Sequence, residues 1–512
     1  MIDIFLLIVI ISITIILLIS SLYILAYYSN PDDTNFGSSL ICKIISILGL
    51  TITFGEVLLL PLDVSNIRGD LGGLRMDLIW KITYITIAIF IFVIIPFANS
   101  FYECDPDSTF CQKIFGSFCF FFFEIIIIAL IFFLGFLFFG KADIPISSFE
   151  CNIDKSININ ETINLNNTNL CGNNSNSYLN IKVGFPIFSI GLLSFISNFF
   201  FVLFCGIGIF SFPLDMIYSF CTRPERIKKT KIEEIKSEIV STAVDLKELA
   251  LSIKKMEKEG DDKKPFYSKE KRNYKNKLNE LKMGVSVLDQ QYEIIDIQNI
   301  IDGKGIIQYY CNFYFGIFFL IISFIWITHI LLYLILKKNN QPMHLFLNKI
   351  LLLFTEKNLN FLSIGIFSLF CFYLLISTIK GNFKFGLRFL FFTIHPMKRN
   401  ETYMNSILFN IMLLMLTSVA VTQFCVKAFN DYAAMTDIDL IFSYQIQYLT
   451  FFSFFFKYHI FEYIFYAVVI ISFIYLICRP NDTKTMKKIL YKELEIEKNK
   501  KGKLIELQEN VD

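Results

Sequence analysis

Charge is scarce in this sequence. Asp, Glu, Lys and Arg make up 18% of its 512 residues, against about 25% in a typical soluble domain. The formal net charge is only +2, and no basic stripe alternates with aromatic residues, so the sequence predicts no nucleic-acid partner. The twelve cysteines are scattered without the spacing of a zinc site or a disulfide framework. Hydrophobic residues make up 54% of the chain, and a lipid bilayer is therefore the expected surrounding.

Motifs of common enzyme classes are also missing. The stretches "GDLGGLR" and "IDGKG" lack the spacing and context of phosphate-binding loops. No helix carries a paired His and Glu, and no serine sits in a nucleophile elbow. We therefore expect no enzyme activity, no catalytic or metal site and no cofactor. An ATP-binding cassette is missing as well, so active transport would need a partner that supplies the energy.

Long apolar runs predict an all-α, polytopic integral membrane protein, because about 20 apolar residues in a helix cross a bilayer. The first run opens with Asp3 and has no basic region before it, so we read it as a span and not as a cleaved signal peptide. Two shorter stretches, 343–355 and 440–456, leave the number of crossings open, and an interfacial or re-entrant helix is favoured for 343–355. The nine predicted spans are 3–28, 40–61, 78–98, 114–139, 184–213, 308–336, 359–379, 403–428 and 457–478.

The loops between these spans predict an orientation. Lys and Arg are dense in 222–304, in 380–402 and after Arg479, which places these segments in the cytosol and the amino terminus outside or in a lumen. The predicted domains are a first membrane half at 1–220 with an outside glycosylated loop at 140–183, a cytosolic insert at 221–305, a second membrane half at 306–478 and a charged cytosolic tail at 479–512.

Two features of the outside loop support this orientation. It contains glycosylation sequons at Asn160, Asn166 and Asn173, although sequons at Asn400 and Asn481 fall on the predicted cytosolic side. Cys151 and Cys171 flank the loop and could form a disulfide in an oxidising compartment. Free thiols at both positions are the equally weighted alternative.

The insert carries a coiled-coil pattern. Apolar residues recur with a 3.5-residue period from Ile232 to Met256 and again from Tyr274 to Ile295, which indicates two helices that each need a partner. Gly260 separates the two halves together with Pro265. We predict an antiparallel coiled-coil hairpin. It either ties the membrane halves together or binds cytosolic or membrane partners through 231–300.

Ionisable groups inside the spans need a physical reason, since each costs at least about 2.5 kcal/mol near the bilayer centre. Glu56 and Asp63 share a face of the second span, and Lys81 opens the third. A Glu56–Lys81 ion pair is favoured over an ion or substrate pathway. Glu124 and His329 could line a polar interior or hydrogen-bond between helices, as could Asn198, Asn405, Asn410 and Gln423.

One short motif occurs twice. Pro61-Leu62-Asp63 recurs as Pro213-Leu214-Asp215, each time at the predicted end of an apolar run. Proline near a helix end removes a backbone donor, and the aspartate can lie in headgroup water. Span termination is favoured over a weak inverted repeat of the transporter kind.

Five stretches carry a family resemblance. They are "YSNPDDTNFG", "LLLPLDVSNIR", "IIPFANSFYECD", "GIGIFSFPLDMIYSFCTRP" and "FFTIHPMKRNETYMNSILFN". The most specific pieces are the Pro-x-Asp motif of the second span and "TIHPMK", with His395, Pro396 and Lys398. In these stretches the chain resembles the lipocalin-interacting membrane receptor family, also called the limb-region-type membrane protein family, and is most similar to its plant and protist branch. The resemblance covers the chain from the first span to about residue 478.

The resemblance implies about nine spans, an outside amino terminus and a central cytosolic coil. Relatives include a receptor that internalises lipocalin-type ligands and a lysosomal protein needed for cobalamin export beside an ATP-binding-cassette partner. We therefore expect a non-enzymatic receptor or adaptor of the surface or endolysosomal membrane. The alternative is a transporter or obligate transporter subunit of the lysosomal membrane, resembling the cobalamin-export relative.

Overall fold

The protein is built from long apolar helices. Within the described residues, nine helices are long and apolar enough to cross a membrane, one for each predicted span. The computed structural model describes all residues except 1–3, 31–32, 34–37, 69–73, 105–109, 152–170, 222–232, 234–235, 246, 249–250, 253–275, 278–305, 339–340, 386, 390–391, 396, 398–400 and 479–512.

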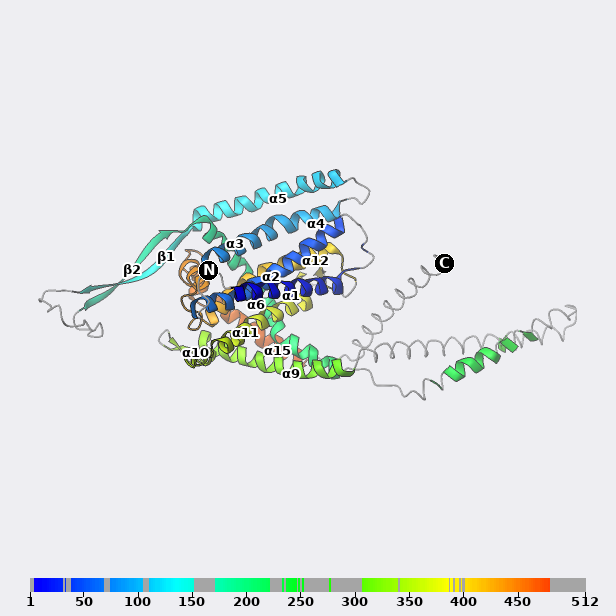
Figure 1. Cartoon of the computed structure of the whole chain (residues 1–512). Helices are drawn as coiled ribbons and strands as arrows, with labels where there is room; N and C mark the ends of the chain where they lie inside the picture. The colour runs from blue at the N-terminus through cyan, green and yellow to red at the C-terminus, as the bar shows by residue number, and fades with distance from the viewer. Residues whose placement is uncertain are drawn as a thin grey trace. The chain divides into compact units, whose positions relative to one another are not determined.

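The predicted all-α polytopic class is confirmed. Figure 1 shows the helices of the nine spans. They are α1 (Ile4–Tyr28), α2 (Ser38–Arg68), α3 (Met76–Ile89) continued by η1 (Phe90–Ile94) and α4 (Ile95–Glu103), α5 (Phe110–Phe139), α6 (Phe185–Cys221), α9 (Ile306–His329) continued by η2 (Ile330–Ile335), α11 (Asn360–Phe385), α12 (Met404–Ala428) and α15 (Ile460–Cys478).

Helix α12 is the most enclosed span. In an 18-residue apolar stretch of each span, 89% of α12 is buried within the protein, against 6% of α5, and α12 packs against α2, α11 and α4. Most spans are apolar all round, so hydrophobic periodicity alone does not decide which helix is central. Serine, threonine, asparagine and glutamine recur along α12, whereas α5 is mainly Phe, Ile and Leu. Small and polar side chains favour helix–helix contact in lipid, which explains the central place of α12.

Two glycines allow α6 and α11 to touch. A Cβ on Gly208 would lie 1.7 Å from the Ser377 carbonyl oxygen, and one on Gly381 would lie 1.8 Å from the Phe204 carbonyl oxygen. Neither position has room for a larger residue unless the backbones move apart. Close backbone approach at small residues is a common means of helix association in membranes.

The two Pro-Leu-Asp motifs do not end their helices, so the predicted termination is wrong. Pro61 lies inside α2, which continues to Arg68, and Pro213 lies inside α6. Proline removes one backbone hydrogen bond, but the flanking turns retain theirs. Asp63 is fully buried and does not lie in headgroup water. The predicted second span was therefore too short at its carboxyl end.

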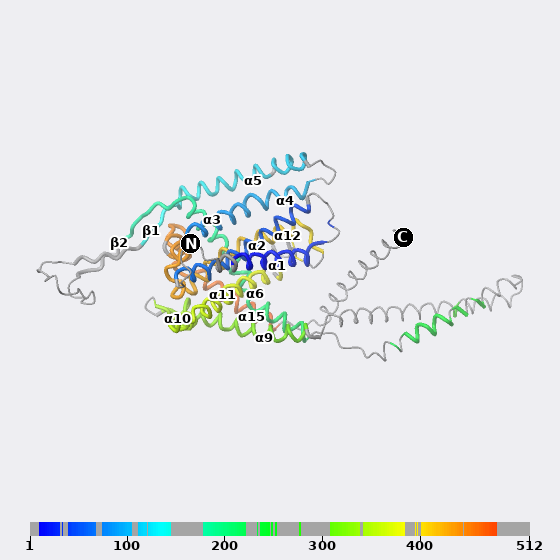
Figure 2. The backbone as a smooth tube through the Cα atoms, viewed as in Figure 1, coloured from blue at the N-terminus to red at the C-terminus, as the bar shows by residue number. Residues whose placement is uncertain are grey.

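One end of the helix bundle carries a β-ladder that the sequence analysis did not predict. Strand β1 (Lys141–Cys151) pairs antiparallel with β2 (Cys171–Lys182), and Figure 2 traces the two strands away from the ends of α5 and α6. The strand base is tied to the segment before α15, because Asp143 N donates to the Tyr448 carbonyl and Thr450 N donates to the Lys141 carbonyl, both at 3.0 Å. We call this the ladder end.

The two stretches whose crossing was left open form short helices. In 343–355 the helix is α10 (Leu347–Glu356), and in 440–456 there are η3 (Leu440–Ile446) and α14 (Ser453–Lys457), preceded by α13 (Asp437–Asp439). Ten residues of helix extend about 15 Å, which is half of a bilayer core. None of these helices is long enough to cross. The remaining strands are β3 (Lys337–Lys338) with β4 (Gln341–Pro342) and β5 (Leu387–Phe389) with β6 (Phe392–Ile394).

The chain divides into two compact units. One comprises Met1–Pro213 with Phe319–Cys478, and the other comprises Leu214–Phe318 with Arg479–Asp512. Most of the predicted coiled-coil hairpin lies outside the described residues. Within the described part, residues 236–245 are helical.

Candidate intramembrane site

A buried carboxyl group lies between α2 and α12. Glu56 is 1% exposed. The Ser418 hydroxyl donates a hydrogen bond to Glu56 Oε2, and the Thr422 hydroxyl donates to Oε1 at 3.3 Å. Ser418 and Thr422 are four residues apart, so both lie on one face of α12. Glu56 is twelve residues before Arg68, the last residue of α2, which is about 18 Å along the helix.

Two aromatic side chains of α3 connect this carboxyl to a second one. Tyr84 lies beside Glu56, and its ring stacks on Trp80 with centroids 5.7 Å apart. Trp80 Nε1 donates to Asp63 Oδ2 at 2.8 Å. All four side chains are 1% exposed or less. We call Glu56, Asp63, Trp80 and Tyr84 the carboxyl cluster.

Asp63 also anchors the ladder end. Its Oδ2 accepts a hydrogen bond from Ile438 N at 3.1 Å, at the start of the short helices that precede α15. Its Oδ1 is buried and has no hydrogen-bond partner. The aspartate of the first Pro-Leu-Asp motif thus fixes a loop 375 residues away in sequence.

The predicted Glu56–Lys81 ion pair is not formed. Lys81 instead pairs with Asp77, one turn earlier on α3, with Nζ 3.8 Å from Oδ2 and both side chains more than 40% exposed. Trp80 and Tyr84 occupy the buried face of α3, so Lys81, next to Trp80, projects to another face. Among the described residues, Glu56 forms no ion pair.

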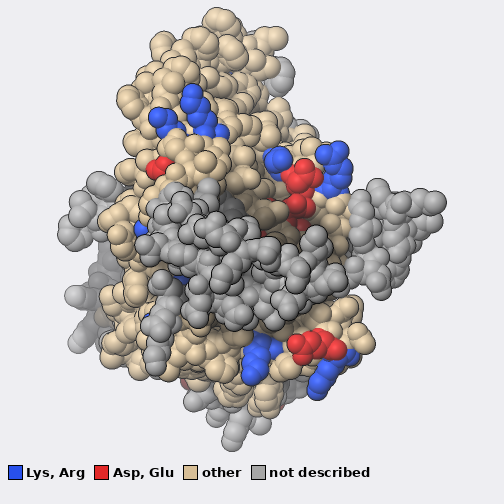
Figure 3. Space-filling model, turned by 90° about the vertical axis from the view of Figure 1, so that its left-hand side faces the viewer, with Lys and Arg blue, Asp and Glu red and all other residues tan. Residues whose placement is uncertain are grey.

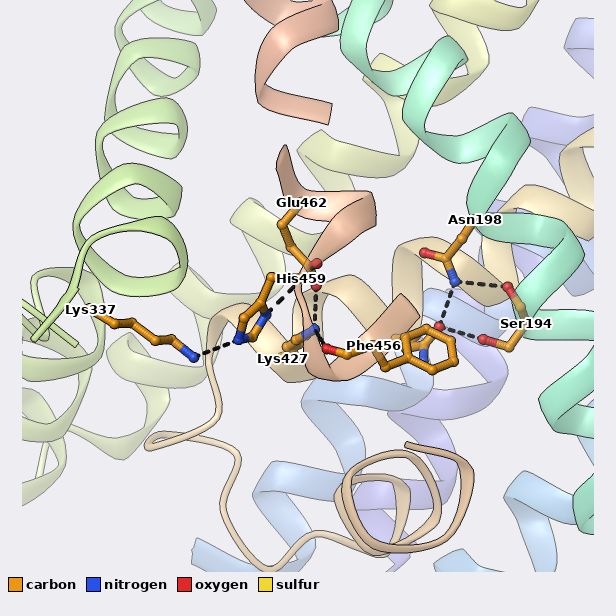
Figure 4. A network of polar contacts seen from close by, with 8 residues as sticks. Ser194, Asn198, Lys337, Lys427, Phe456, His459 and Glu462 are labelled. Atoms are coloured by element: carbon orange, nitrogen blue, oxygen red, sulfur yellow. Dashed lines mark hydrogen bonds and ion pairs between the residues drawn. The ribbon is translucent and has the colours of Figure 1, made fainter. Parts of the chain in front are cut away.

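A second polar group joins α6 to α12. The Ser194 hydroxyl donates to Gln423 Oε1, and Asn198 Nδ2 donates to the same oxygen at 2.8 Å. Figure 4 shows Ser194 and Asn198 of this group as neighbours on α6. The Ser197 hydroxyl accepts from Ala420 N at 2.9 Å. Asn198 and Gln423 were predicted as interior polar groups or interhelical hydrogen-bond partners. The structure places them in the second role.

A third polar group lies at the ladder end of α12. Lys427 forms an ion pair with Glu462 of α15, and Lys337 Nζ donates to His459 Nε2 at 2.9 Å (Figure 4). His459 Nδ1 is 3.8 Å from Glu462 Oε2. Burial, followed by the charge of Lys427, lowers the pKa of His459 to about 4, so the neutral ring accepts the Lys337 hydrogen bond. Burial also holds the pKa of Lys337 below its usual range.

A cavity of about 20 Å³ separates the second polar group from the third. Its polar lining comes from Gln423, Lys427, Ser443 and Gln447. This volume fits about one water molecule, and the site offers the polar partners that a buried water needs. Lys427, His459 and Glu462 were not singled out in the sequence, although all three lie within the predicted spans 403–428 and 457–478.

The other predicted polar residues lie apart from the carboxyl cluster. His329 is buried, and its Nε2 is 2.9 Å from the Ala428 carbonyl oxygen, while its ring stacks on Tyr333. Glu124 is exposed on α5, so it does not line the bundle interior. In the part of the chain that the structure describes, no cluster of His, Cys, Asp and Glu has the arrangement of a metal site.

The remaining motif residues are structural where they are described. His395 has a positive φ of 53°, and its Nδ1 lies 3.0 Å from the Ser406 hydroxyl. Its carbonyl accepts from Asn410 Nδ2 at 3.0 Å, so this turn is fixed to the first turns of α12. Asn405 accepts from Ser406 N at 2.7 Å. Asp215 lies in the last turns of α6. Pro396, Lys398, Asn160 and Asn166 lie outside the described residues, and Asn173 lies in β2.

Comparisons with known proteins identify the family of the chain. A family model described as LMBR1-like membrane protein matches residues 6–302 and 268–477. A LIMR family protein of Dictyostelium discoideum is 34% identical over 94% of this chain and 99% of its own length. A LIMR family protein of Oryza sativa subsp. japonica is 30% identical over 90% of this chain and 94% of its own length. One of Arabidopsis thaliana is 31% identical over 92% of this chain and 95% of its own length. No solved structure matches. These matches confirm the predicted family, and the chain belongs to the LMBR1-like membrane proteins.

Proposed function

We propose that this protein is a non-enzymatic transporter, or an obligate transporter subunit, in which Glu56 binds and releases a proton during the transport cycle. The supporting observation is the setting of the Glu56 carboxyl. It is buried between α2 and α12, it is held by the hydroxyls of Ser418 and Thr422, and it forms no ion pair among the described residues.

The cost of a buried charge argues for proton binding. A carboxylate in a span costs at least about 2.5 kcal/mol on insertion scales, and two hydroxyl donors compensate it less well than a cation does. In this setting the neutral acid is the stable form. Ionisation requires water or a cation to reach the carboxyl. Separation of α12 from α2 would withdraw Ser418 and Thr422 and permit it.

The test is a proton-flux assay. The full-length protein is reconstituted in liposomes that contain a pH-sensitive dye, and the decay of an imposed pH gradient is followed. We expect the wild type to dissipate the gradient faster than empty liposomes, and Glu56→Gln to abolish the excess. Glu124→Gln is the matched control, because it neutralises another carboxyl within a span, but one that is exposed.

Two results would count against the proposal. One is a wild-type rate equal to that of empty liposomes, which rejects a transporter that works without a partner. The other is an undiminished rate for Glu56→Gln in protein that melts at the wild-type temperature. If the glutamine variant does not fold, Ser418→Ala provides the second test, because it removes one hydroxyl from Glu56 and should change the pH dependence of the flux.

A receptor or adaptor role is the second candidate. The observation that favours it is the helix at 236–245, where Val240 and Val244 are 63% and 50% exposed at a helical spacing of four. Exposed apolar side chains on one helix face can bind a partner helix. We propose that this helix lies on the cytosolic side of the surface or endolysosomal membrane. An ATP-binding-cassette transporter is one class of protein that could bind it there.

Affinity purification in mild detergent tests the second candidate. Partners recovered with the wild type should be lost with Val240→Asp combined with Val244→Asp. They should be retained with Lys236→Asp combined with Lys247→Asp, which alters two exposed residues of the same segment. An unchanged partner set with the valine variant would contradict the adaptor role.

A further inference from the structure

An apolar groove of about 450 Å³ lies between α3 with η1, α5 and α6. This volume is within the range of roughly 300–1,000 Å³ found for small-molecule sites. Its lining is almost wholly hydrocarbon, with Ser189 and Tyr84 as the two hydroxyl side chains. The Ser189 hydroxyl already donates to the Phe185 carbonyl at 2.9 Å. The groove therefore suits an apolar chain better than water or a polar solute.

The groove has the length of one bilayer leaflet. It extends from Tyr84 to Val93 on one wall and from Phe185 to Leu193 on another. At 1.5 Å per residue these stretches cover about 12 to 14 Å, close to half of a hydrocarbon core of about 30 Å. All three walls belong to spans, so the medium beside the groove is lipid. The acyl chain of a lipid in the leaflet at the ladder end has a length that matches this groove.

The groove ends near the base of the β-ladder. A Cβ on Gly135 would lie 3.1 Å from the Phe188 ring, so α5 and α6 are in contact there. Phe136 packs against Phe185 and Phe188, with ring centroids 5.5 and 5.7 Å apart. The chain enters β1 five residues after Phe136. The head of a lipid whose tail fills the groove is therefore at the level of the ladder base.

Two lysines face each other at that base. Lys141 and Lys182 are direct partners across the ladder, and both are exposed. Like charges at opposed strand positions are unfavourable. The nearest acid on the same face, Asp143, accepts a hydrogen bond from Asn180 at 2.6 Å. Among the described residues neither lysine forms an ion pair. Figure 3 views this end of the molecule, where basic side chains gather in small groups on a mostly uncharged surface.

We propose that the groove binds one acyl chain of an anionic phospholipid, whose phosphate lies between Lys141 and Lys182. The apolar walls accommodate the tail, and the lysine pair supplies the complementary charge at the end of the groove. This assignment is independent of the proposed transport function. It predicts selective binding of lipids that have both an acyl tail and an anionic head group.

Lipid binding can be measured on the delipidated full-length protein in detergent by native mass spectrometry. Phosphatidylglycerol is titrated against phosphatidylcholine with the same acyl chains, and glycerol phosphate serves as the probe without a tail. We expect phosphatidylglycerol to bind more tightly than phosphatidylcholine, and glycerol phosphate not to bind. Lys141→Gln with Lys182→Gln should lower the phosphatidylglycerol affinity by about thirty-fold, the value expected from two surface lysines near an anionic lipid.

Matched controls separate charge from shape. Lys349→Gln with Lys357→Gln removes two exposed lysines of the α10 region and should leave binding unchanged. Ala88→Trp fills the groove and should lower the affinity for both lipids, whereas Ile82→Trp, at a 55% exposed position of α3, should not. If Ala88→Trp does not fold, Ala129→Phe on the exposed wall of α5 replaces it.

Four results would overturn the assignment. The first is equal binding of the two lipids by the wild type. The second is unchanged phosphatidylglycerol binding after loss of Lys141 and Lys182. The third is tight glycerol phosphate binding, and the fourth is lipid binding that survives filling of the groove. Either of the last two would place the ligand on the surface and not between the helices.

Discussion

Single residues decide how closely the helices approach. Gly208→Ala should destabilise the protein by about 1–3 kcal/mol or more, the usual cost of overpacking, because the added Cβ meets the Ser377 backbone at 1.7 Å. The neighbour is main chain and cannot rotate away. The measurement is the thermal unfolding temperature in detergent. Gly365→Ala on α11 is the control, since nothing lies within 4 Å of its Cβ; equal melting of both variants would contradict the packing argument.

A titration at His459 should make stability depend on pH. The pKa of His459 is lowered to about 4, from about 6.5 in an unfolded chain. The unfolded state thus binds more protons in this interval, and stability falls as pH drops from about 6.5 to 4. Lys337, Lys427 and Glu462 are the charged groups that face the ring.

Thermal melts between pH 7.5 and 4.5 check this prediction. His459→Asn keeps a residue that tolerates the positive φ of 53° and removes the titration. We expect the variant to lose less stability than the wild type over this interval. Parallel curves for the two proteins would show that other groups carry the pH dependence.

At the scale of elements, the spans were predictable and their contacts were not. Composition and length identify a membrane helix, and each predicted span has its counterpart. The extension of α2 beyond Pro61 was missed because proline was read as a stop. Glu56 and Asp63 were identified as polar residues within a span, but Ser418 and Thr422 lie more than 360 residues away. Only the packing of α2 on α12 brings them together.

The β-ladder yields a covalent prediction. The register places Cys151 opposite Cys171, which agrees with the disulfide considered from the sequence. We expect the two cysteines to be linked if the ladder lies in an oxidising compartment. Peptide mapping of protein alkylated without reduction should recover one cross-linked peptide, and it should disappear after reduction. Full alkylation of both cysteines before reduction would contradict the disulfide.

At the scale of the whole molecule, the orientation in the membrane can be tested by glycosylation. The predicted outside loop at 140–183 contains Asn160, Asn166 and Asn173, whereas Asn400 and Asn481 lie on the opposite side under the positive-inside rule. Glycans are added only on the lumenal side. Glycosidase treatment should therefore increase the gel mobility of the wild type, and Asn→Gln at the three loop positions should abolish that shift.

The reciprocal variant makes the orientation test decisive. Asn→Gln at positions 400 and 481 should leave the glycosidase shift unchanged, because these sequons are predicted to face the cytosol. If the shift depends on Asn400 and Asn481 and not on the loop asparagines, the predicted orientation is wrong and the opposite one holds. The lysine pair at the ladder base would then face the cytosolic leaflet, and anionic lipids of that leaflet would be its ligands.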